Sequence, residues 1–247
     1  MPDSQPGAVT TSDTDLDPRE TRKATDPVRF DAAKAVGAAR ARLSEVRRSD
    51  PERFESPEES AGKERARLQR ELIAHGVPRR YAEATWDEAP DYPELREWRV
   101  PIILRAKLHA GRGLMLFGPV GTGKSSVAAL LCGEVVKLGL SVAWEYTQSL
   151  LDSLYEGAAG TVSRLKSPSL LVLDDFGVSQ MGAYHIKELE KIVEARYRAR
   201  RSTVVTGNLD PAALSGDEKL QRIVDRWKQA NTPLYMPGQS RRKPEDG

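Results

Sequence analysis

The chain has 247 residues, and 38 Lys and Arg residues nearly balance 36 Asp and Glu residues, so its formal net charge of +2 does not require nucleic acid as a partner. No run approaches the ~18 consecutive apolar residues of a membrane span, and the polar start lacks the order of a signal peptide, so we expect a cytoplasmic protein with no membrane partner. A single cysteine, Cys132, excludes an internal disulfide and is expected in the core, while three scattered histidines lack zinc-ligand spacing.

The first third of the chain is predicted to be accessory. Residues 1–27 contain too few large apolar side chains to offset the entropy of ordering, which predicts a disordered tail. Apolar residues at helical spacing predict one helix over 28–48 and another over 61–75 that ends at Gly76. We expect residues 28–75 to dock on a helical partner.

From residue 76 to 243, short β-rich apolar runs alternate with helical patterns. This alternation is typical of an α/β domain with a parallel sheet covered by helices on both faces. Strands are expected at 114–117, 142–146, 170–173 and 203–206, with helices that begin near Lys124, Gln148, Ala183 and Gly216.

The first strand is followed by a phosphate-loop motif. Residues 118–125 fit G-x-x-x-x-G-K-[ST], and the motif lies between a strand and an amphipathic helix, so a chance Gly-rich turn is the weaker interpretation. Lys124 is expected to bridge the β- and γ-phosphates of ATP, and the Ser125 hydroxyl to ligate Mg²⁺. The residues expected to contact the nucleotide here are Gly118, Pro119, Val120, Gly121, Thr122, Gly123, Lys124, Ser125 and Ser126.

Two later strands end in polar residues. The strand at 170–173 runs into Asp174 and Asp175, as in a Walker B element. Asp174 is expected to hold Mg²⁺ through water, and Asp175 to orient the attacking water. The strand at 203–206 is followed by Asn208, our candidate for a sensor of the γ-phosphate, although Gly-Asn alone is only a turn signal.

Over residues 76–243 these elements resemble the helicase-loader ATPases of the DnaC/DnaI type and their relative, the IstB transposition helper. The resemblance also includes residues 76–86 and the stretch Gln221-Arg222-Ile223-Val224-Asp225-Arg226. It implies an AAA+ P-loop fold and an ATPase that uses ATP and Mg²⁺.

The same resemblance implies roles for three more residues. Tyr81 would run beside the adenine, with domain packing as the alternative. Arg226 would act as an arginine finger on a neighbouring subunit's nucleotide, and Arg241 would belong to the sensor 2 region. Ordinary surface arginines of a helix are the alternative for both.

This group of ATPases carries extra helical structure that lines a groove for single-stranded DNA. Its place in the chain corresponds to residues 147–167 and the start of the next helix. Tyr184 and Tyr155 are candidates to stack on bases, and Lys187, with Arg164 and Lys166, to follow phosphates. The alternative is that the tyrosines are half-buried packing residues.

The resemblance implies a self-associating, ATP-dependent replicative helicase loader that binds a hexameric DnaB-like helicase and single-stranded DNA, with ATP as the switch. The alternative is an IstB-like transposition helper that acts on duplex DNA with a transposase. A third possibility, a nucleotide kinase or hydrolase with a small-molecule substrate, would need a lid and an acceptor pocket that the sequence does not indicate.

Overall fold

The computed structural model describes residues 32–49, 56–177, 181–208, 218 and 220–241, and the chain divides into two units, 1–55 and 56–247. The first unit contains helix α1 (Ala32–Ser49), close to the predicted span of 28–48. The predicted tail, 1–27, lies outside the described residues. Within the described ranges, no helix combines the length and apolar character needed to cross a membrane.

The second unit is built on a five-stranded parallel sheet with strand order β2-β3-β4-β1-β5. The strands are β1 (Gly113–Phe117), β2 (Val142–Tyr146), β3 (Leu170–Phe176), β4 (Ser202–Gly207) and β5 (Asn231–Tyr235). This confirms the predicted parallel α/β sheet. The edge strand β5 was not predicted, because its sequence Asn-Thr-Pro-Leu-Tyr contains a proline that only an edge position tolerates.

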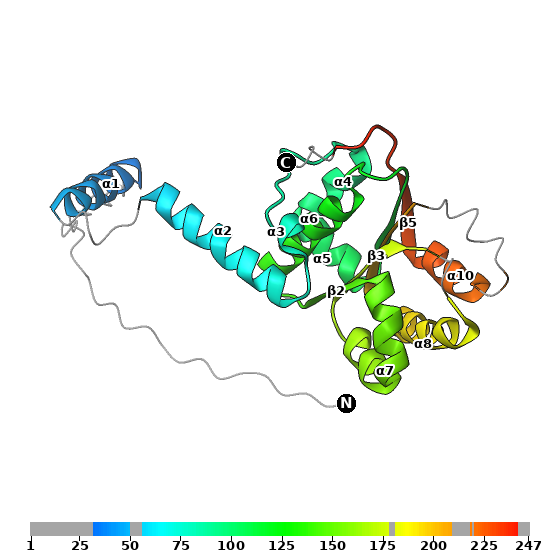
Figure 1. The fold of residues 1–247 in the computed structure, drawn as a ribbon. Coiled ribbons are helices and arrows are strands. Elements are labelled where there is room, and N and C mark those ends of the chain that lie inside the picture. The colour runs from blue at the N-terminus through cyan, green and yellow to red at the C-terminus, as the bar shows by residue number, and fades with distance from the viewer. Residues whose placement is uncertain (1–31, 50–55, 178–180, 209–217, 219, 242–247) are drawn as a thin grey trace, which may run out of the picture. The chain divides into compact units, whose positions relative to one another are not determined.

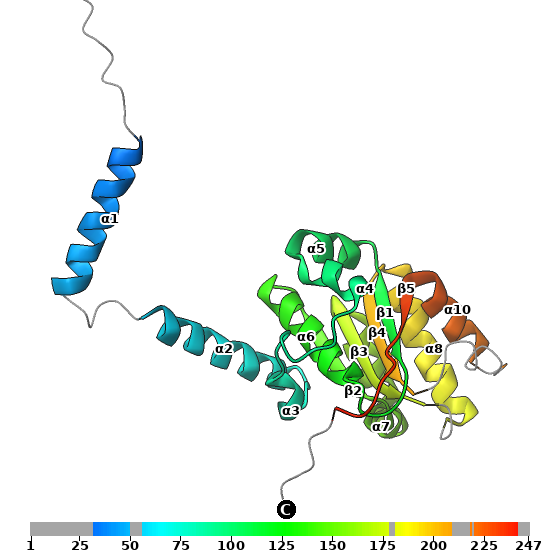
Figure 2. The same cartoon turned by 90° about the horizontal axis from the view of Figure 1, so that it is seen from above.

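Helices cover both faces of this sheet (Figures 1 and 2). The helices are α2 (Pro57–Ala74), α3 (Arg79–Ala82), α4 (Pro93–Arg96), α5 (Pro101–His109), α6 (Lys124–Lys137), α7 (Thr147–Lys166), α8 (Ala183–Arg198) and α10 (Gln221–Ala230), with a short 3₁₀ turn η2 (Glu97–Arg99). The predicted helix starts at Lys124 and Ala183 are confirmed, and α7 begins one residue before Gln148. The start predicted at Gly216 lies outside the described residues, and α10 is described from Gln221.

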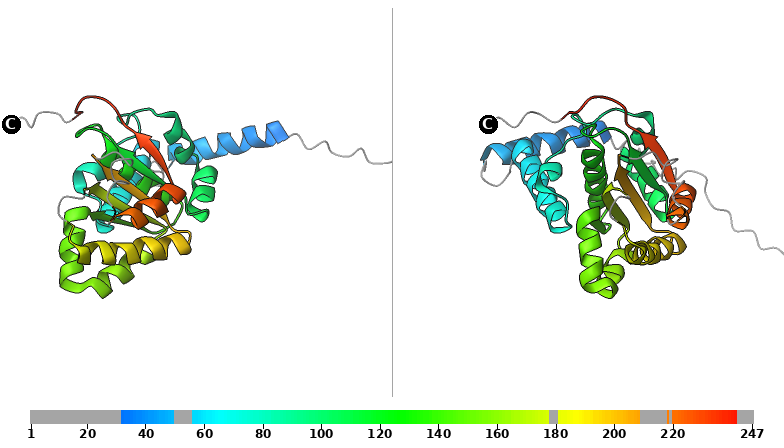
Figure 3. Two further views of the ribbon diagram at one scale, coloured as in Figure 1. Left: turned by 90° about the vertical axis from the view of Figure 1, so that its right-hand side faces the viewer. Right: turned by 45° about the vertical axis from the view of Figure 1, so that its right-hand side comes forward.

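The alternation of side chains along each strand divides the core in two. In β1, Leu114 and Leu116 pack with α2, α5 and α6, whereas Met115 packs with α7, α8 and α10 on the other face. Figure 3 shows α7 and α8 below the sheet, and α10 lies against α8. Cys132 of α6 is fully buried in the first of these clusters, as predicted, and burial raises the pKa of its thiol.

Helix α2 shares this core, although it falls within the predicted docking region 28–75. It begins at a capping box, in which the Ser56 hydroxyl accepts from the Glu59 amide and the Glu59 carboxylate accepts from the Ser56 amide. Leu72 near its end is 4 % exposed, and Leu68 and Leu72 lie over Gly133 of α6. The apolar face of α2 is therefore used for packing against α6.

Candidate nucleotide-binding site

The phosphate loop lies between the end of β1 at Phe117 and the start of α6 at Lys124. Its backbone takes left-handed φ values of 139° at Gly118, 84° at Gly121 and 98° at Gly123. Residues other than glycine adopt such φ values only with strain, and this explains why the motif has glycine at these three positions. The loop thus has the strand, turn and helix context that the motif requires.

Lys124 is held inside the loop rather than extended into solvent. Its side chain is buried, and its Nζ donates to the carbonyl oxygens of Gly118 at 2.8 Å and Pro119 at 2.7 Å. Thr122 also donates to the Pro119 oxygen at 3.0 Å. The ammonium group and the amino end of α6 therefore meet at one place, which suits a bound phosphate chain.

The predicted metal-holding pair is in contact. The Ser125 hydroxyl donates to Asp174 Oδ1 at 2.7 Å, across the gap between α6 and β3. Asp174 is 4 % exposed, and burial raises the pKa of its carboxyl group while hydrogen bonds from Thr206 and Ser125 oppose that shift. A hydroxyl beside a carboxylate is a donor set that fits Mg²⁺, which prefers oxygen ligands.

Asp175 differs from the buried Asp174 in its exposure and in its backbone conformation. Its side chain is exposed, its φ is 55°, and the pairing of β3 with β4 shifts register between Leu173 and Phe176. The Tyr146 hydroxyl donates to Asp175 Oδ2 at 3.2 Å, and the Asp175 charge raises the pKa of Tyr146. The carboxylate therefore stands at the open end of the sheet with a tyrosine beside it.

Asn208 lies at the same edge of the sheet. It directly follows β4 and is exposed, and Gly207 before it pairs with Phe117 of β1 and Phe176 of β3. The structure thus brings Asn208 between the strand ends that carry the phosphate loop and the two acids. Its predicted role as a sensor stays a prediction.

The segment after β5 crosses the phosphate loop. The Arg241 amide donates to the Gly121 carbonyl at 2.8 Å, and the Arg241 guanidinium donates to the Glu88 carbonyl at 3.0 Å. A Cβ atom added at Gly121 would lie only 2.2 Å from the Ser240 hydroxyl, so glycine is required there. The structure therefore brings Arg241 to the loop, together with Glu88, which sequence reasoning did not single out.

Tyr81 lies near the β2 side of the site. Its ring centroid is 6.0 Å from that of Trp144 on β2, and its hydroxyl accepts from Arg80 at 2.9 Å. In the sheet, β2 is separated from β1 by β3 and β4. These contacts are those of a packing residue, and the adenine contact stays a prediction. Pro90 faces Gly123 of the loop instead, 3.6 Å from the position of a Cβ atom there.

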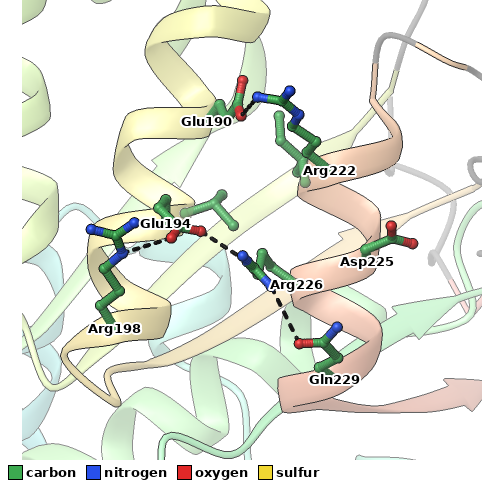
Figure 4. A pocket seen from close by; sticks show the side chains of 9 residues that line it. Glu190, Glu194, Arg198, Arg222, Asp225, Arg226 and Gln229 are labelled. Atoms are coloured by element: carbon green, nitrogen blue, oxygen red, sulfur yellow. Dashed lines mark hydrogen bonds and ion pairs between the residues drawn. The ribbon is translucent and has the colours of Figure 1, made fainter.

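Arg226 is engaged within its own subunit, in a hollow between α8 and α10. Its Nε donates to Glu194 at 2.8 Å, and Glu194 also accepts from Arg198 at 2.7 Å (Figure 4). The Arg226 guanidinium also lies 4.7 Å from the centre of the Tyr197 ring. Helix α10 covers the opposite face of the sheet from α6, which follows the phosphate loop. Arg226 is thus held on a different side of the subunit from its own phosphate loop.

The predicted DNA contacts gather where α7 meets α8. Tyr155 is 80 % exposed and lines a hollow with Asp152, Glu156 and His185. Tyr184 is half exposed, and its hydroxyl donates to the Leu154 carbonyl at 3.1 Å, which links the two helices. The acidic neighbours of Tyr155 would repel a phosphate backbone at that point.

The basic residues of this region differ in whether they form an ion pair. Lys187 and Lys166 are exposed, whereas Arg164 forms an ion pair with Glu145 of β2. Lys187 lies on α8, three residues after Tyr184. Contact of these side chains with DNA stays a prediction.

Sequence reasoning missed two side chains of the site, Thr206 and Tyr146. Thr206 contacts both Asp174 and Asp175, and Tyr146 contacts Asp175. Threonine and tyrosine are ordinary strand residues, so nothing in the sequence distinguishes them.

Comparison with known proteins identifies the family. The family described as IstB-like ATP binding protein matches residues 108–246. A putative ATP-binding protein in an insertion sequence of Mycobacterium tuberculosis is 28 % identical over 145 residues, which cover 53 % of this chain and 58 % of that protein. A putative insertion sequence ATP-binding protein of Sinorhizobium fredii is 34 % identical over 137 residues, or 52 % and 55 % of the two chains. The matches therefore span somewhat more than half the length of these relatives.

A replicative helicase loader DnaC of Buchnera aphidicola is 23 % identical over 182 residues, which cover 67 % of this chain and 72 % of that protein. The crystal structure of DnaI superimposes with a TM-score of 0.56 at 23 % identity and covers 67 % of this chain and 94 % of that one. At 23 % identity, the likeness to DnaI shows the fold alone. The superposition confirms the predicted AAA+ P-loop architecture. Because the family match covers more than half of its residues, the chain belongs to the IstB-like ATP-binding proteins.

Proposed function

We propose that this chain is the ATPase of an insertion sequence, which assembles on duplex DNA with ATP and acts with a transposase in the cytoplasm. The observation that carries this proposal is the family match, together with relatives named as insertion sequence ATP-binding proteins. From the sequence, this function was the alternative to helicase loading, and the names of the relatives favour this alternative.

The geometry at the strand ends supports ATP hydrolysis. Bound Mg²⁺ would neutralise charge on the phosphates as the γ-phosphoryl group transfers to water. Ser125 and Asp174 are the residues that would hold it, and their contact at 2.7 Å shows that they reach one point. Lys124 and the loop amides bind the phosphate chain, while Asp175, beside Tyr146, orients the attacking water.

The position of Arg226 supports self-association. A guanidinium stabilises charge on a transferring phosphoryl group only when it reaches that group. Since Arg226 is held between α8 and α10, away from its own loop, its partner phosphate would belong to a neighbouring subunit. ATP would then be hydrolysed only in the assembled state.

The protein that the chain binds distinguishes this proposal from helicase loading. The chain should be immobilised with an ATP analogue and exposed, in separate experiments, to the purified transposase encoded with it and to the purified replicative helicase of the same cell. Specific binding of the transposase supports the proposal. Binding of the helicase alone contradicts it, and binding of neither favours a small-molecule substrate.

Helicase loading remains the second candidate because of one observation. The match to DnaC covers 67 % of this chain, more than the 53 % covered by the insertion sequence protein of M. tuberculosis, and DnaI shares the fold. A loader would use Tyr155, Tyr184 and Lys187 on single-stranded DNA. The acidic residues beside Tyr155 weigh against that use.

A further inference from the structure

Thr206 is a buried polar residue near the end of strand β4, directly after the apolar pair Val204 and Val205. Its side chain is 1 % exposed, and its hydroxyl makes two hydrogen bonds with the acidic pair of β3. It donates to Asp174 Oδ1 at 2.6 Å and accepts from the Asp175 amide at 2.9 Å. The Thr206 hydroxyl has lone pairs that can accept and one proton that it can donate. It accepts from the Asp175 amide through a lone pair, so its proton is available for the Asp174 carboxylate.

The amide that Thr206 accepts belongs to an irregular point of the sheet. Asp175 has a φ of 55°, and the register of β3 against β4 shifts between Leu173 and Phe176. Such a backbone conformation costs free energy in a residue with a side chain, and the shift removes regular ladder partners. The Thr206 hydroxyl supplies an acceptor for the Asp175 amide at this point. At the same point, Asp175 is exposed although Asp174, directly before it, is buried.

Asp174 is held from three elements. The Ser125 hydroxyl of α6 and the Thr206 hydroxyl of β4 both donate to its Oδ1 atom, and the Thr147 hydroxyl of α7 donates to its backbone carbonyl at 2.9 Å. Of the two side-chain donors, Ser125 is itself a proposed Mg²⁺ ligand. Thr206 is therefore the donor that can keep the carboxylate oriented when Ser125 turns its oxygen to the metal.

We infer that Thr206 is a positioning residue for both acids: its hydroxyl orients the Asp174 carboxylate toward Mg²⁺ and stabilises the backbone irregularity that exposes Asp175. The inference rests on the proposed metal-holding role of Asp174, and it is independent of transposase and DNA. Residues that orient metal-binding carboxylates typically change metal affinity or activity by about 10- to 100-fold when they are replaced.

The test measures binding of a fluorescent ATP analogue with Mg²⁺ and with EDTA, and takes the ratio of the two affinities. Thr206→Val removes the hydroxyl at nearly constant volume, and we expect the ratio to fall about tenfold or more while affinity in EDTA stays unchanged. Thr206→Ser keeps the hydroxyl and should retain the wild-type ratio. Thr203→Val is the matched control, since Thr203 is a buried threonine of the same strand whose hydroxyl accepts from Arg196.

A folded Thr206→Val protein with the wild-type ratio would overturn the inference, as would an equal loss in Thr203→Val. If Thr206→Val does not fold, Thr206→Cys takes its place, because a thiol is of similar size and a weak donor. An absence of any Mg²⁺ effect in the wild-type protein would instead contradict the metal-holding role of Asp174, and the inference would fall with it.

Discussion

Glu194 of α8 and Arg226 of α10 form an ion pair of 2.8 Å within one subunit, and Arg226 lies at the same time over the ring of Tyr197. The pair lowers the pKa of the Glu194 carboxyl group, through hydrogen bonds from Arg226 and then Arg198, and raises the pKa of Arg226. Arg226 is thus held in a fixed place on a partly exposed face, where a second subunit can meet it. The first two predictions follow from this placement.

Arg226→Ala should bind ATP with wild-type affinity but lose hydrolysis in the assembled state by a factor that reaches ~10³ for arginine fingers. Mixing it with Asp175→Asn should recover part of the activity, because the intact Arg226 of one subunit would then meet the intact Asp175 of the other. Steady-state hydrolysis of the mixture, with co-assembly verified by light scattering, provides the measurement. A mixture as inactive as either parent would show that Arg226 does not act on a neighbour's ATP.

Glu194→Gln should lower hydrolysis several-fold in the assembled state and leave ATP affinity unchanged, since the neutral amide holds the guanidinium less firmly. Glu190→Gln is the matched control: Glu190 is also on α8, and its partner is Arg222 at 3.1 Å. The hydrolysis rates of the two variants are compared at equal degrees of assembly, and a larger loss in Glu194→Gln than in Glu190→Gln would support the prediction. Equal losses would indicate a general effect of charge on this face.

Lys124→Ala should abolish tight ATP binding, because it removes the ammonium group held at the Gly118 and Pro119 carbonyls beside the amino end of α6. Asp175→Asn should leave binding intact and slow turnover, since it changes only the carboxylate proposed to orient the attacking water. Fluorescence titration and a hydrolysis assay on both variants separate the two roles. Wild-type affinity in Lys124→Ala would be incompatible with the proposed phosphate site.

Arg196→Met should destabilise the fold by about 3 kcal/mol or more. Arg196 is 1 % exposed, burial lowers its pKa to about 9, and its guanidinium donates to the carbonyls of Leu165, Pro168 and Ser202. The variant would remove the Arg196 donor from those three carbonyl oxygens. Urea unfolding against the exposed Arg201→Met control checks this, and equal stabilities would contradict it.

The parts of the site that could be predicted are those carried by continuous sequence. The phosphate loop has a fixed spacing, and Asp174 and Asp175 follow an apolar run directly, so strand, turn and chemistry were predictable together. Thr206 and Tyr146 could not be predicted, because each joins the site only through the order of strands in the sheet. The pairing of Glu194 with Arg226 likewise depends on how α8 and α10 pack.

The same limit applies to the fold. Leu68 and Leu72 are spaced as on an amphipathic helix, and that spacing does not say whether their face meets a partner or the chain's own α6. Four strands were apolar enough to be recognised, whereas β5 has two apolar residues beside Pro233 in its five positions. Its place beside β1 becomes evident only from the parallel register of Gly113 with Asn231.

The most direct test of ATP-dependent assembly on duplex DNA is DNA binding measured by fluorescence anisotropy, with labelled duplex and single-stranded oligonucleotides of equal length. With an ATP analogue and Mg²⁺, we predict tight, cooperative binding to the duplex, weaker binding to the single strand, and loss of duplex binding in Lys124→Ala. A preference for the single strand, or duplex binding that is the same without nucleotide, would contradict an ATP-dependent assembly on duplex DNA.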